Sequence, residues 1–520
     1  MASRFGIRLA EARGSDSLLL KRRGDDDGYR FAIHARFRPG QAPARHARAR
    51  RPASCSLPIR PVRSAHVSAR PQTIRRLTTA ALFGALVCLY NANGREIGGS
   101  DSQPTKLGAR ALALRGNLQL DLDVARQPLL AERASFARDR RGHYRSAYSP
   151  VGSVTGGIVA IVLRGAGVDL NAPRGPNLVA VLAASITTAA AVCLVLLTLA
   201  RFASLPVSLA VAIGLGLGTN FWALHSQTLA QHDVVALGTA LALFSWLRPT
   251  SALAPRHVWL GALGLGLAVL ARTQVAPLVA VLAVGLVARV GVRRAAGPLA
   301  LTALMLGGLL AAQWRWFGHP LGAMPLLESL HPDVHGVSGS LSREPWIGAA
   351  GLLISPSRGL LVYSPVVICA LAGLGAARGA LPHHGVGWNH LACVAQYLGY
   401  ASYTVWWGGH SYGPRYVLDF IVLLTPAAAI QLARMRRPIF RALAALALLW
   451  SIAAAGTGAF FADLWNTSPA SVDRHHDRLW DWRDPQILRA WSVGLSPQNF
   501  NLFNWTSVRQ APVGDDPKAP

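Results

Sequence analysis

The sequence predicts an all-α, polytopic integral membrane protein with about 11 transmembrane helices, within a range of about 10 to 13. Hydrophobic residues make up 52% of the 520 residues, charged residues make up only 15%, and the mean hydropathy is positive. This composition is typical of a polytopic membrane protein. Charge-poor runs such as Asn177–Ala200 are also long enough to cross a hydrocarbon core of roughly 30 Å.

The N-terminal segment, residues 1–75, is rich in Arg, Ala and Pro. It has no apolar region near its start, so it does not resemble a cleavable signal peptide. The net charge of +28 would suggest nucleic acid in a soluble protein, but residues 1–76 alone hold 18 Lys and Arg against five Asp and Glu. We therefore expect a disordered cytoplasmic tail over residues 1–75 and no nucleic-acid partner.

The membrane region is expected over residues 76–460, followed by a tail, residues 461–520, on the outer face. The stretch Val151–Leu163 is short and Gly-rich, which favours a juxtamembrane or re-entrant helix within a long first outer loop, residues 93–175. The spans are expected near 76–92, 176–200, 205–223, 233–247, 257–272, 274–289, 296–314, 359–377, 388–406, 417–433 and 440–459.

The short connections predict the orientation, because Lys and Arg are enriched in cytoplasmic loops. With the N-terminus inside, the cytoplasmic connections carry Arg201, Arg248, Arg256, Arg289, Arg293, Arg294, Arg378, Arg434, Arg436, Arg437 and Arg441, and no acidic residue. The C-terminus is then outside. The polar residues that a bilayer disfavours gather on the outer face, where ionisable residues at membrane depth indicate a site.

Asp101, just beyond the first span, could serve as a general base if it is partly desolvated, or it could only cap a helix. Asp121 and Asp123 form a D-x-D pair that could bind a divalent cation or simply face water. His225, His232 and Asp233 cluster near the outer end of a span. They could hold a metal, although we expect them to contact a sugar or phosphate.

Arginines recur at the outer ends of other spans. A guanidinium binds phosphate bidentately and keeps its charge at membrane depth, but a single one could equally extend to the lipid headgroups. Arg358 in GLLISPSRGLLVYSP and Arg415 in WWGGHSYGPRY each precede an apolar helix, whose positive N-terminal end would favour an anion. The four arginines in question are Arg272, Arg315, Arg358 and Arg415.

Several motifs are missing from the sequence. It contains no nucleotide-binding loop in a strand–helix setting and no Cys/His zinc pattern, and the segment Gly214–Thr219 (GLGLGT) is better explained by close helix packing. We therefore expect no cofactor and no resident metal, although a divalent cation remains an alternative.

Seven segments of the sequence carry a resemblance to a known family. They are the Asp101 region with RGNLQLDLD, HYRSAYSPVG, HSQTLAQHD, LARTQ, RWFGHPLG, GLLISPSRGLLVYSP and WWGGHSYGPRY. These segments resemble bacterial membrane glycosyltransferases of the GT-C type, near the dolichyl-phosphate-mannose protein mannosyltransferase and aminoarabinose transferase group. The resemblance covers residues 75–460. It departs from that group in lysine content, because Lys106 is the only lysine in the membrane region and Arg145 stands where related proteins often have lysine.

The resemblance implies inverting transfer of a sugar from a polyprenyl-phosphate donor to an acceptor hydroxyl on a glycan, lipid or protein. It implies Asp101 as the catalytic carboxylate and Arg272, Arg358 and Arg415 as ligands of the lipid phosphate. The expected location is the bacterial inner membrane, with the active site on its outer face. Further substrate contacts are expected from His225, His232, Asp233, Arg145, Tyr363, His410 and Tyr412.

Two other function classes stay open. A transporter or flippase of a lipid-linked or anionic substrate usually shows repeated halves and polar groups at mid-depth, and neither is evident in the sequence. A membrane scaffold without catalytic activity predicts that Asp101→Asn changes stability alone.

Overall fold

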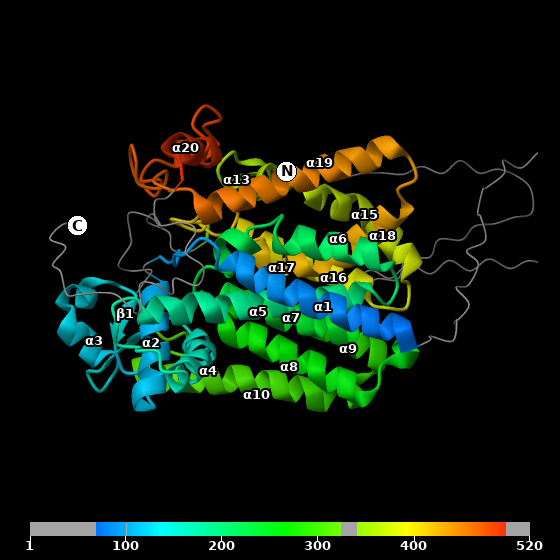
Figure 1. The fold of residues 1–520 in the computed structure, drawn as a ribbon. Helices are drawn as coiled ribbons and strands as arrows, with labels where there is room; N and C mark the ends of the chain where they lie inside the picture. The colour runs from blue at the N-terminus through cyan, green and yellow to red at the C-terminus, as the bar shows by residue number, and fades with distance from the viewer. Residues whose placement is uncertain (1–68, 100, 324–340, 496–520) are drawn as a thin grey trace, which may run out of the picture. The chain divides into compact units, whose positions relative to one another are not determined.

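The structure, a computed structural model, describes residues 69–99, 101–323 and 341–495 (Figure 1). These residues belong to a unit that runs from Val67 to Pro520. The predicted N-terminal tail therefore lies almost wholly outside the described residues, as does the end of the outer tail. The first helix begins at Ala69, several residues before the predicted start of the first span.

The first half of the membrane region forms helices where the sequence predicts spans. Proline lies in the first turn of several of these helices and glycine with positive φ follows others, as expected for helix ends (Gly291, φ 80°; Gly318, φ 82°). They are α1 (Ala69–Tyr90), α5 (Gly175–Leu199), α6 (Leu205–Gly216), α7 (His232–Trp246), α8 (Pro255–Ala271), α9 (Ala276–Val290) and α10 (Val292–Phe317). A π-helical turn, Phe221–His225, follows α6, and 3₁₀ turns lie at Thr250–Ala252 and Thr273–Val275.

The second half is more interrupted than the sequence predicts. The spans expected at 359–377 and 417–433 are each broken by a 3₁₀ turn, Pro365–Val367 and Val422–Leu424. Proline at 365 and 426 removes a backbone donor, which explains why a helix restarts there. The helices are α13 (Pro345–Ile354), α14 (Leu360–Tyr363), α15 (Ile368–Ala380), α16 (Val386–Ala401), α17 (Leu418–Ile421), α18 (Thr425–Arg434) and α19 (Pro438–Phe460).

The protein is an all-α polytopic membrane protein, as predicted, and the described residues add one short hairpin within the segment predicted as the first outer loop. Among the described residues, five helices are long and apolar enough to cross a membrane, and the other expected spans are shorter or interrupted. The count of 11 spans stays a prediction. Large apolar side chains on α10 and α19, among them Leu304, Leu446 and Leu449, are exposed and suit contact with lipid.

The helices of the bundle pack closely where glycines face one another. A Cβ on Gly238 of α7 would lie 2.4 Å from the carbonyl oxygen of Gly264 on α8, so neither position has room for a side chain. Gly216 of α6 likewise lies against Tyr90 of α1, whose hydroxyl donates to the Gly216 carbonyl at 3.0 Å. Small residues at such crossings let helix backbones approach within a membrane. The packing interpretation of the GLGLGT segment therefore fits the structure.

The segment predicted as the first outer loop, residues 93–175, contains short helices, as expected. Val151–Gly165 forms a complete helix, and its glycines lie against α2, where a Cβ on Gly157 would meet Leu112. Figure 1 shows this loop gathered at one end of the bundle, the end at which α20 also lies. Its elements are α2 (Ser102–Arg115), α3 (Asp121–Arg126), a 3₁₀ turn (Pro128–Glu132), β1 (Phe136–Arg138), β2 (Tyr144–Ser146) and α4 (Val151–Gly165).

The two strands pair antiparallel, with Phe136 opposite Ser146. The C-terminal tail adds a 3₁₀ turn (His476–Trp480) and α20 (Gln486–Val493). At the opposite end of the bundle, the Arg-rich connections contact one another: Arg289 donates to the carbonyls of Trp246 and Arg248. The basic connections and the outer-loop elements thus lie at different ends, because α7 runs from His232 at one end to Trp246 at the other.

Candidate functional site

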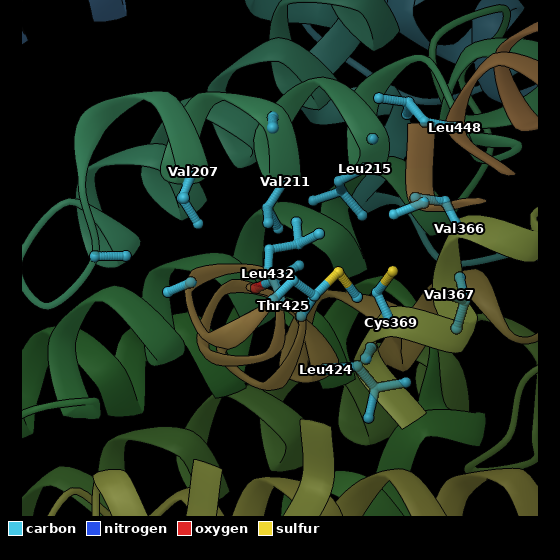
Figure 2. Close-up of a pocket in the computed structure, with 18 of the residues that line it drawn as sticks. Val207, Val211, Leu215, Val366, Val367, Cys369, Leu424, Thr425, Leu432 and Leu448 are labelled. Atoms are coloured by element: carbon cyan, nitrogen blue, oxygen red, sulfur yellow. The ribbon is translucent and has the colours of Figure 1, made fainter. Parts of the chain in front are cut away.

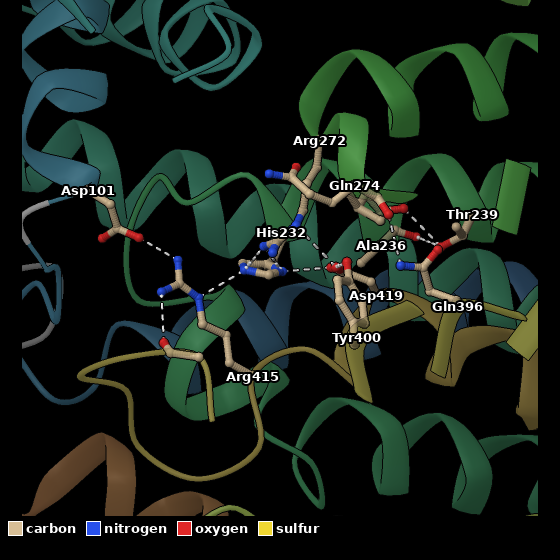
Figure 3. A network of polar contacts seen from close by, with 12 residues as sticks. Asp101, His232, Ala236, Thr239, Arg272, Gln274, Gln396, Tyr400, Arg415 and Asp419 are labelled. Carbon is tan, nitrogen blue, oxygen red and sulfur yellow. Dashed lines mark hydrogen bonds and ion pairs between the residues drawn. The ribbon is translucent and has the colours of Figure 1, made fainter. Parts of the chain in front are cut away.

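Four segments that are distant in sequence bring charged side chains together at the end of the bundle beside the first outer loop (Figure 3). Asp101 precedes α2, His232 begins α7, and Arg272 follows α8. The remaining segment runs from α16 through the WWGGHSYGPRY loop into α17. We call the connected group the polar cluster; its members are Asp101, His232, Arg272, Tyr400, Arg415 and Asp419.

Asp101 and Arg415 form the outermost contact of the polar cluster. Nη2 of Arg415 donates to Oδ2 of Asp101, and the two side chains are 25% and 29% exposed. Burial alone would raise the pKa of Asp101, but the neighbouring guanidinium outweighs burial and holds that pKa below the usual aspartate range. Asp101 makes no side-chain cap to α2, so the helix-cap alternative is not supported by the structure.

His232 lies between a carboxylate on one side and guanidinium groups on the other. Its Nδ1 is 2.6 Å from Oδ1 of Asp419, whereas Nε of Arg415 donates to its Nε2 at 2.9 Å. Because a guanidinium can only donate, Nε2 is the acceptor and the proton sits on Nδ1. His232 is therefore a neutral bridge that fixes the direction of the Arg415 side chain.

Asp419 is the buried centre of the polar cluster, with no exposed surface. Its Oδ2 lies 3.6 Å from Nε of Arg272 and also accepts from the Tyr400 hydroxyl. The Arg272 guanidinium packs over the rings of Tyr400 and Tyr416, 5.5 and 5.1 Å from their centroids. Arg272 is consequently held by its surroundings and is only 7% exposed.

Asp419 and Tyr400 were not among the site residues expected from the sequence. The signal was present for Asp419, because an ionisable residue inside the apolar run LDFIVLL indicates a functional or paired group. No comparable signal marks Tyr400, since a tyrosine in a membrane helix is unremarkable until its partner is known.

His225 lies next to His232, with the rings stacked and their centroids 5.6 Å apart. Ligand atoms of His225, His232 and Asp419 all lie within 4.8 Å of one another, which is a spacing suited to a metal ion. However, the Nε2 lone pair of His232 already faces two arginines, whose positive charges oppose a cation. The donor set favours a hydrogen-bonded chain over a metal site.

Asp233 follows His232 in α7 but does not join the polar cluster. Its carboxylate is fully buried and neither oxygen has a hydrogen-bond partner among the described residues. The structure does not bring it to Asp101, and nothing in the structure gives it a role in binding.

Arg358, Tyr363 and Tyr412 lie in a second group, which we call the Arg358 cluster together with Asn466 and Gln486. Arg358 has no exposed surface, and its five contacts use all sides of the guanidinium. The acceptors are the carbonyls of Ser357, Trp407 and Gly409 and the side-chain oxygens of Gln486 and Asn466, at 2.6 to 3.2 Å. Arg358 has no donor left for a lipid phosphate, so its geometry favours a positioning role.

Tyr363 and Tyr412 complete this cluster. The Tyr363 hydroxyl donates to Gln486 at 3.1 Å and its ring meets that of Tyr412 edge-on, with centroids 5.3 Å apart. Tyr412 in turn donates to the carbonyl of Ala454 on α19. The Arg358 cluster thus connects the WWGGHSYGPRY loop to the C-terminal tail and holds its shape.

The expected helix N-termini behind Arg358 and Arg415 need correction. The helices that follow, α14 and α17, each have only four residues, and α17 begins at Leu418. Their dipoles are too short to form an anion site. The shape of the loop depends instead on glycines with left-handed backbone, such as Gly413 (φ 61°), where a Cβ would meet Asn220 and the Tyr363 ring.

Several other expected site residues lie apart from the polar cluster. Arg145 pairs with Asp139 at 2.7 Å and packs over Trp316, and exposed His410 pairs with Asp473 at 3.0 Å. Arg315 is exposed, which suits contact with headgroups. Lys106 is buried against Glu96, 2.8 Å away.

The D-x-D pair also has partners within the outer loop. Asp123 pairs with Arg110 and Arg115, and Asp121 accepts from the backbone of Tyr144 at 3.0 Å. Both carboxylates stabilise the loop, so the structure gives the pair no open cation site.

A large cavity of about 720 Å³ lies between α6, α15, α18 and α19 (Figure 2). Side chains such as Val211, Leu215, Val366 and Leu432 line it, and Arg441 is the charged residue in its wall. This lining suits a hydrocarbon chain. Apart from Arg441, whose Nε donates to the Met435 carbonyl at 2.9 Å, the lining formed by the described residues offers nothing to an anion, and it holds no carboxylate that could act as a base.

No protein-family model matches the chain, and no curated protein matches it. The similar solved structures include crystal structures of ArnT from Cupriavidus metallidurans in the apo state and bound to undecaprenyl phosphate. The identities are 13% and 14%, the TM-scores 0.44 and 0.43, and each match covers 75% of this chain. The chain spans 64% and 65% of the length of these two proteins. Both come from the aminoarabinose transferase group that the sequence motifs resemble.

Proposed function

We propose that the protein is a membrane glycosyltransferase that moves a sugar from a polyprenyl-phosphate donor to an acceptor hydroxyl. The observation that carries this proposal is the contact between Asp101 and Arg415, part of a cluster that also holds Arg272. A carboxylate and two guanidinium groups supply what the transfer needs: a base for the hydroxyl and positive charge for the phosphate. Both outer side chains remain partly exposed, so substrates can reach them.

In the proposed reaction the acceptor oxygen attacks the anomeric carbon from the face opposite the phosphate. The bond between that carbon and the phosphate oxygen breaks, and its electron pair leaves with the polyprenyl phosphate. The hydroxyl proton passes to the Asp101 carboxylate, and the configuration at the anomeric carbon inverts. Arg415 and Arg272 stabilise the charge that develops on the leaving phosphate, an effect that preorganised cations deliver strongly in a water-poor site.

The proposed orientation places the polar cluster on the outer face of a bacterial inner membrane, with the N-terminus in the cytoplasm. The Arg-rich connections at the other end of the bundle support this orientation, because short basic loops stay in the cytoplasm. The donor's prenyl chain would lie among the apolar helices. The acceptor, which is a glycan, lipid or protein, would approach from the outer loop. No cofactor is needed, since the leaving phosphate supplies the driving force.

The test is transfer from radiolabelled polyprenyl-phosphate sugars to a membrane extract by the purified full-length protein in nanodiscs. We expect label to transfer with the wild type and to fall by about 10²–10⁴ with Asp101→Asn, the usual contribution of a general base. Arg415→Ala should also lose transfer. Asp484→Asn is the matched control, because Asp484 also pairs with an arginine and is 26% exposed, but lies in the tail.

Two results would contradict the proposal. Asp101→Asn that transfers as well as the wild type would exclude Asp101 as the base of the reaction. Failure with every donor, together with movement of labelled lipid across a liposome bilayer, would instead identify the transporter or flippase alternative.

A further inference from the structure

The two arginines that would bind the donor phosphate are already neutralised in the ligand-free protein. Arg415 pairs with Asp101, and Arg272 pairs with Asp419. With His232 neutral, the polar cluster has two positive and two negative charges and no net attraction for an anion. A phosphate must therefore replace a carboxylate at one of the arginines before it can bind strongly.

The two arginines differ in how readily they can exchange their partner. Arg272 is 7% exposed, and its carboxylate partner has no exposed surface. Arg415 and Asp101 are each about a quarter exposed, so an arriving anion can reach that pair. Arg415 is the arginine at which exchange costs less, because Asp101 can be solvated when it is released.

The geometry of Arg415 also lets the exchange occur without moving its guanidinium. Its Nε is held by His232 at 2.9 Å, and His232 is in turn held by Asp419 at 2.6 Å. Among the described residues, by contrast, the Nη atoms donate to Asp101 and to the Gly408 carbonyl, the latter at a long 3.5 Å. Figure 3 shows this division, with the Nε side turned towards the cluster and the Nη side turned towards Asp101.

We propose that Arg415 is an exchangeable partner that couples donor binding to activation of Asp101. The donor phosphate displaces Asp101 from the Nη atoms of Arg415, and the released carboxylate becomes the base for the acceptor hydroxyl. Before the donor binds, the same ion pair keeps Asp101 a weak base. Donor must then bind before an acceptor can be deprotonated. This inference rests on the proposed function and adds to it the order of events.

The coupling makes an unusual prediction for binding: the catalytic carboxylate is a competitor of the phosphate. Undecaprenyl phosphate is the probe, added to the full-length protein in detergent, and Kd is measured by thermophoresis. Asp101→Asn should bind it about fivefold more tightly than the wild type, the size expected for a partly exposed ion pair. Asp484→Asn should bind as the wild type does, and polyprenol without phosphate should bind all three proteins equally.

Removal of any nearby negative charge could also favour an anion, so the route through Arg415 needs its own control. Asp101→Asn is therefore measured again in an Arg415→Gln background. Coupling predicts that Asp101→Asn no longer tightens the binding of undecaprenyl phosphate in the Arg415→Gln background. The single and double variants then bind it equally, or neither binds it. A gain of the same size without Arg415 would show general repulsion and would overturn the inference.

Failure of the inference can be distinguished from failure of the proposed function. If the wild type binds undecaprenyl phosphate and Asp101→Asn binds it equally or more weakly, the coupling is overturned and the proposed function stands. Absence of binding to the wild type overturns both. Asp101→Ser, which also removes the charge, serves where Asp101→Asn does not yield folded protein, as judged by a single peak in size exclusion.

Discussion

The carboxylate of Asp101 is hydrogen-bonded to the guanidinium of Arg415, although 314 positions separate the two residues in the chain. This contact joins the segment after the first span to the WWGGHSYGPRY loop. It also joins the two kinds of group that the proposed reaction needs, a base and a phosphate ligand. Their pairing in the ligand-free protein implies that neither is available until a substrate separates them.

Stability should depend on pH through this pair. The folded-state pKa of Asp101 lies below its unfolded value, so the pair stabilises the protein above the ordinary aspartate pKa of about 4. That stability is lost as pH falls through the lowered pKa. Wild type should therefore melt above Asp101→Asn at pH 7, and the difference should vanish in acid. Thermal melts from pH 7 to pH 3 measure it, and a difference that grows in acid would contradict the assignment.

The pH dependence of transfer should reveal the release of Asp101. In the free protein Asp101 faces Arg415, with His232 and Tyr148 nearby, and Arg415 lowers the pKa of Asp101. Once phosphate has taken Arg415, that pKa should rise. The acid limb of kcat, which reports the complex, should then have a higher pKa than that of kcat/KM for the donor. The same pKa in the acid limbs of kcat and kcat/KM would mean that Asp101 and Arg415 stay paired.

Arg358 and Arg415 should respond differently to lysine. Lysine cannot reproduce the planar fork that Arg358 uses to reach five acceptors, so Arg358→Lys leaves buried oxygens unpaired. At about 1–3 kcal/mol for each unpaired group, the loss should be ~3 kcal/mol or more. Arg415→Lys should change stability little and weaken donor binding. The melting temperature and the donor Kd of both variants test this difference in role. A loss of stability in Arg415→Lys together with a loss of donor binding alone in Arg358→Lys would refute it.

Asp419 should act as a positioning residue whose loss is partly repaired by loss of its partner. Asp419→Asn leaves Arg272 buried without a countercharge and should destabilise the protein by about 3–5 kcal/mol. Adding Arg272→Met removes the unpaired charge and should restore much of the stability while transfer stays low. Additive destabilisation in the double variant would show that the two residues do not interact.

Gly413 should tolerate alanine worse than Gly409. Both have left-handed φ, so alanine costs ~1–2 kcal/mol at either position. Only at Gly413 would the new Cβ also meet the Tyr363 ring and Asn220, whereas the space around Gly409 is open. Gly413→Ala should therefore lose about 1–3 kcal/mol more than Gly409→Ala, the usual cost of overpacking. Equal melting temperatures would count against this packing.

The sequence alone determined the fold class and where most helices of the membrane region lie, whereas the number of spans stays a prediction. This was possible because a bilayer admits long apolar helices and little else, so hydropathy and proline nearly define the elements. It also led to Asp101, His232, Arg272 and Arg415, because charge at a membrane boundary is costly and therefore conspicuous. The helices expected after Arg358 and Arg415 were predicted too long. The 3₁₀ turns that interrupt them, at proline or inside an apolar run, change the hydropathy little.

Only the tertiary structure decided which of these groups meet. Arg358 and Arg415 look alike in sequence, each beside glycine and proline before an apolar run. Arg358 is buried against backbone carbonyls and two side-chain amides of the tail, whereas Arg415 is partly exposed and paired with Asp101. The roles of Asp419, Tyr400 and Gln486 follow only from the residues that they contact. The physical reason is that helix formation depends on local side chains, whereas pairing of charges depends on how segments hundreds of residues apart are packed.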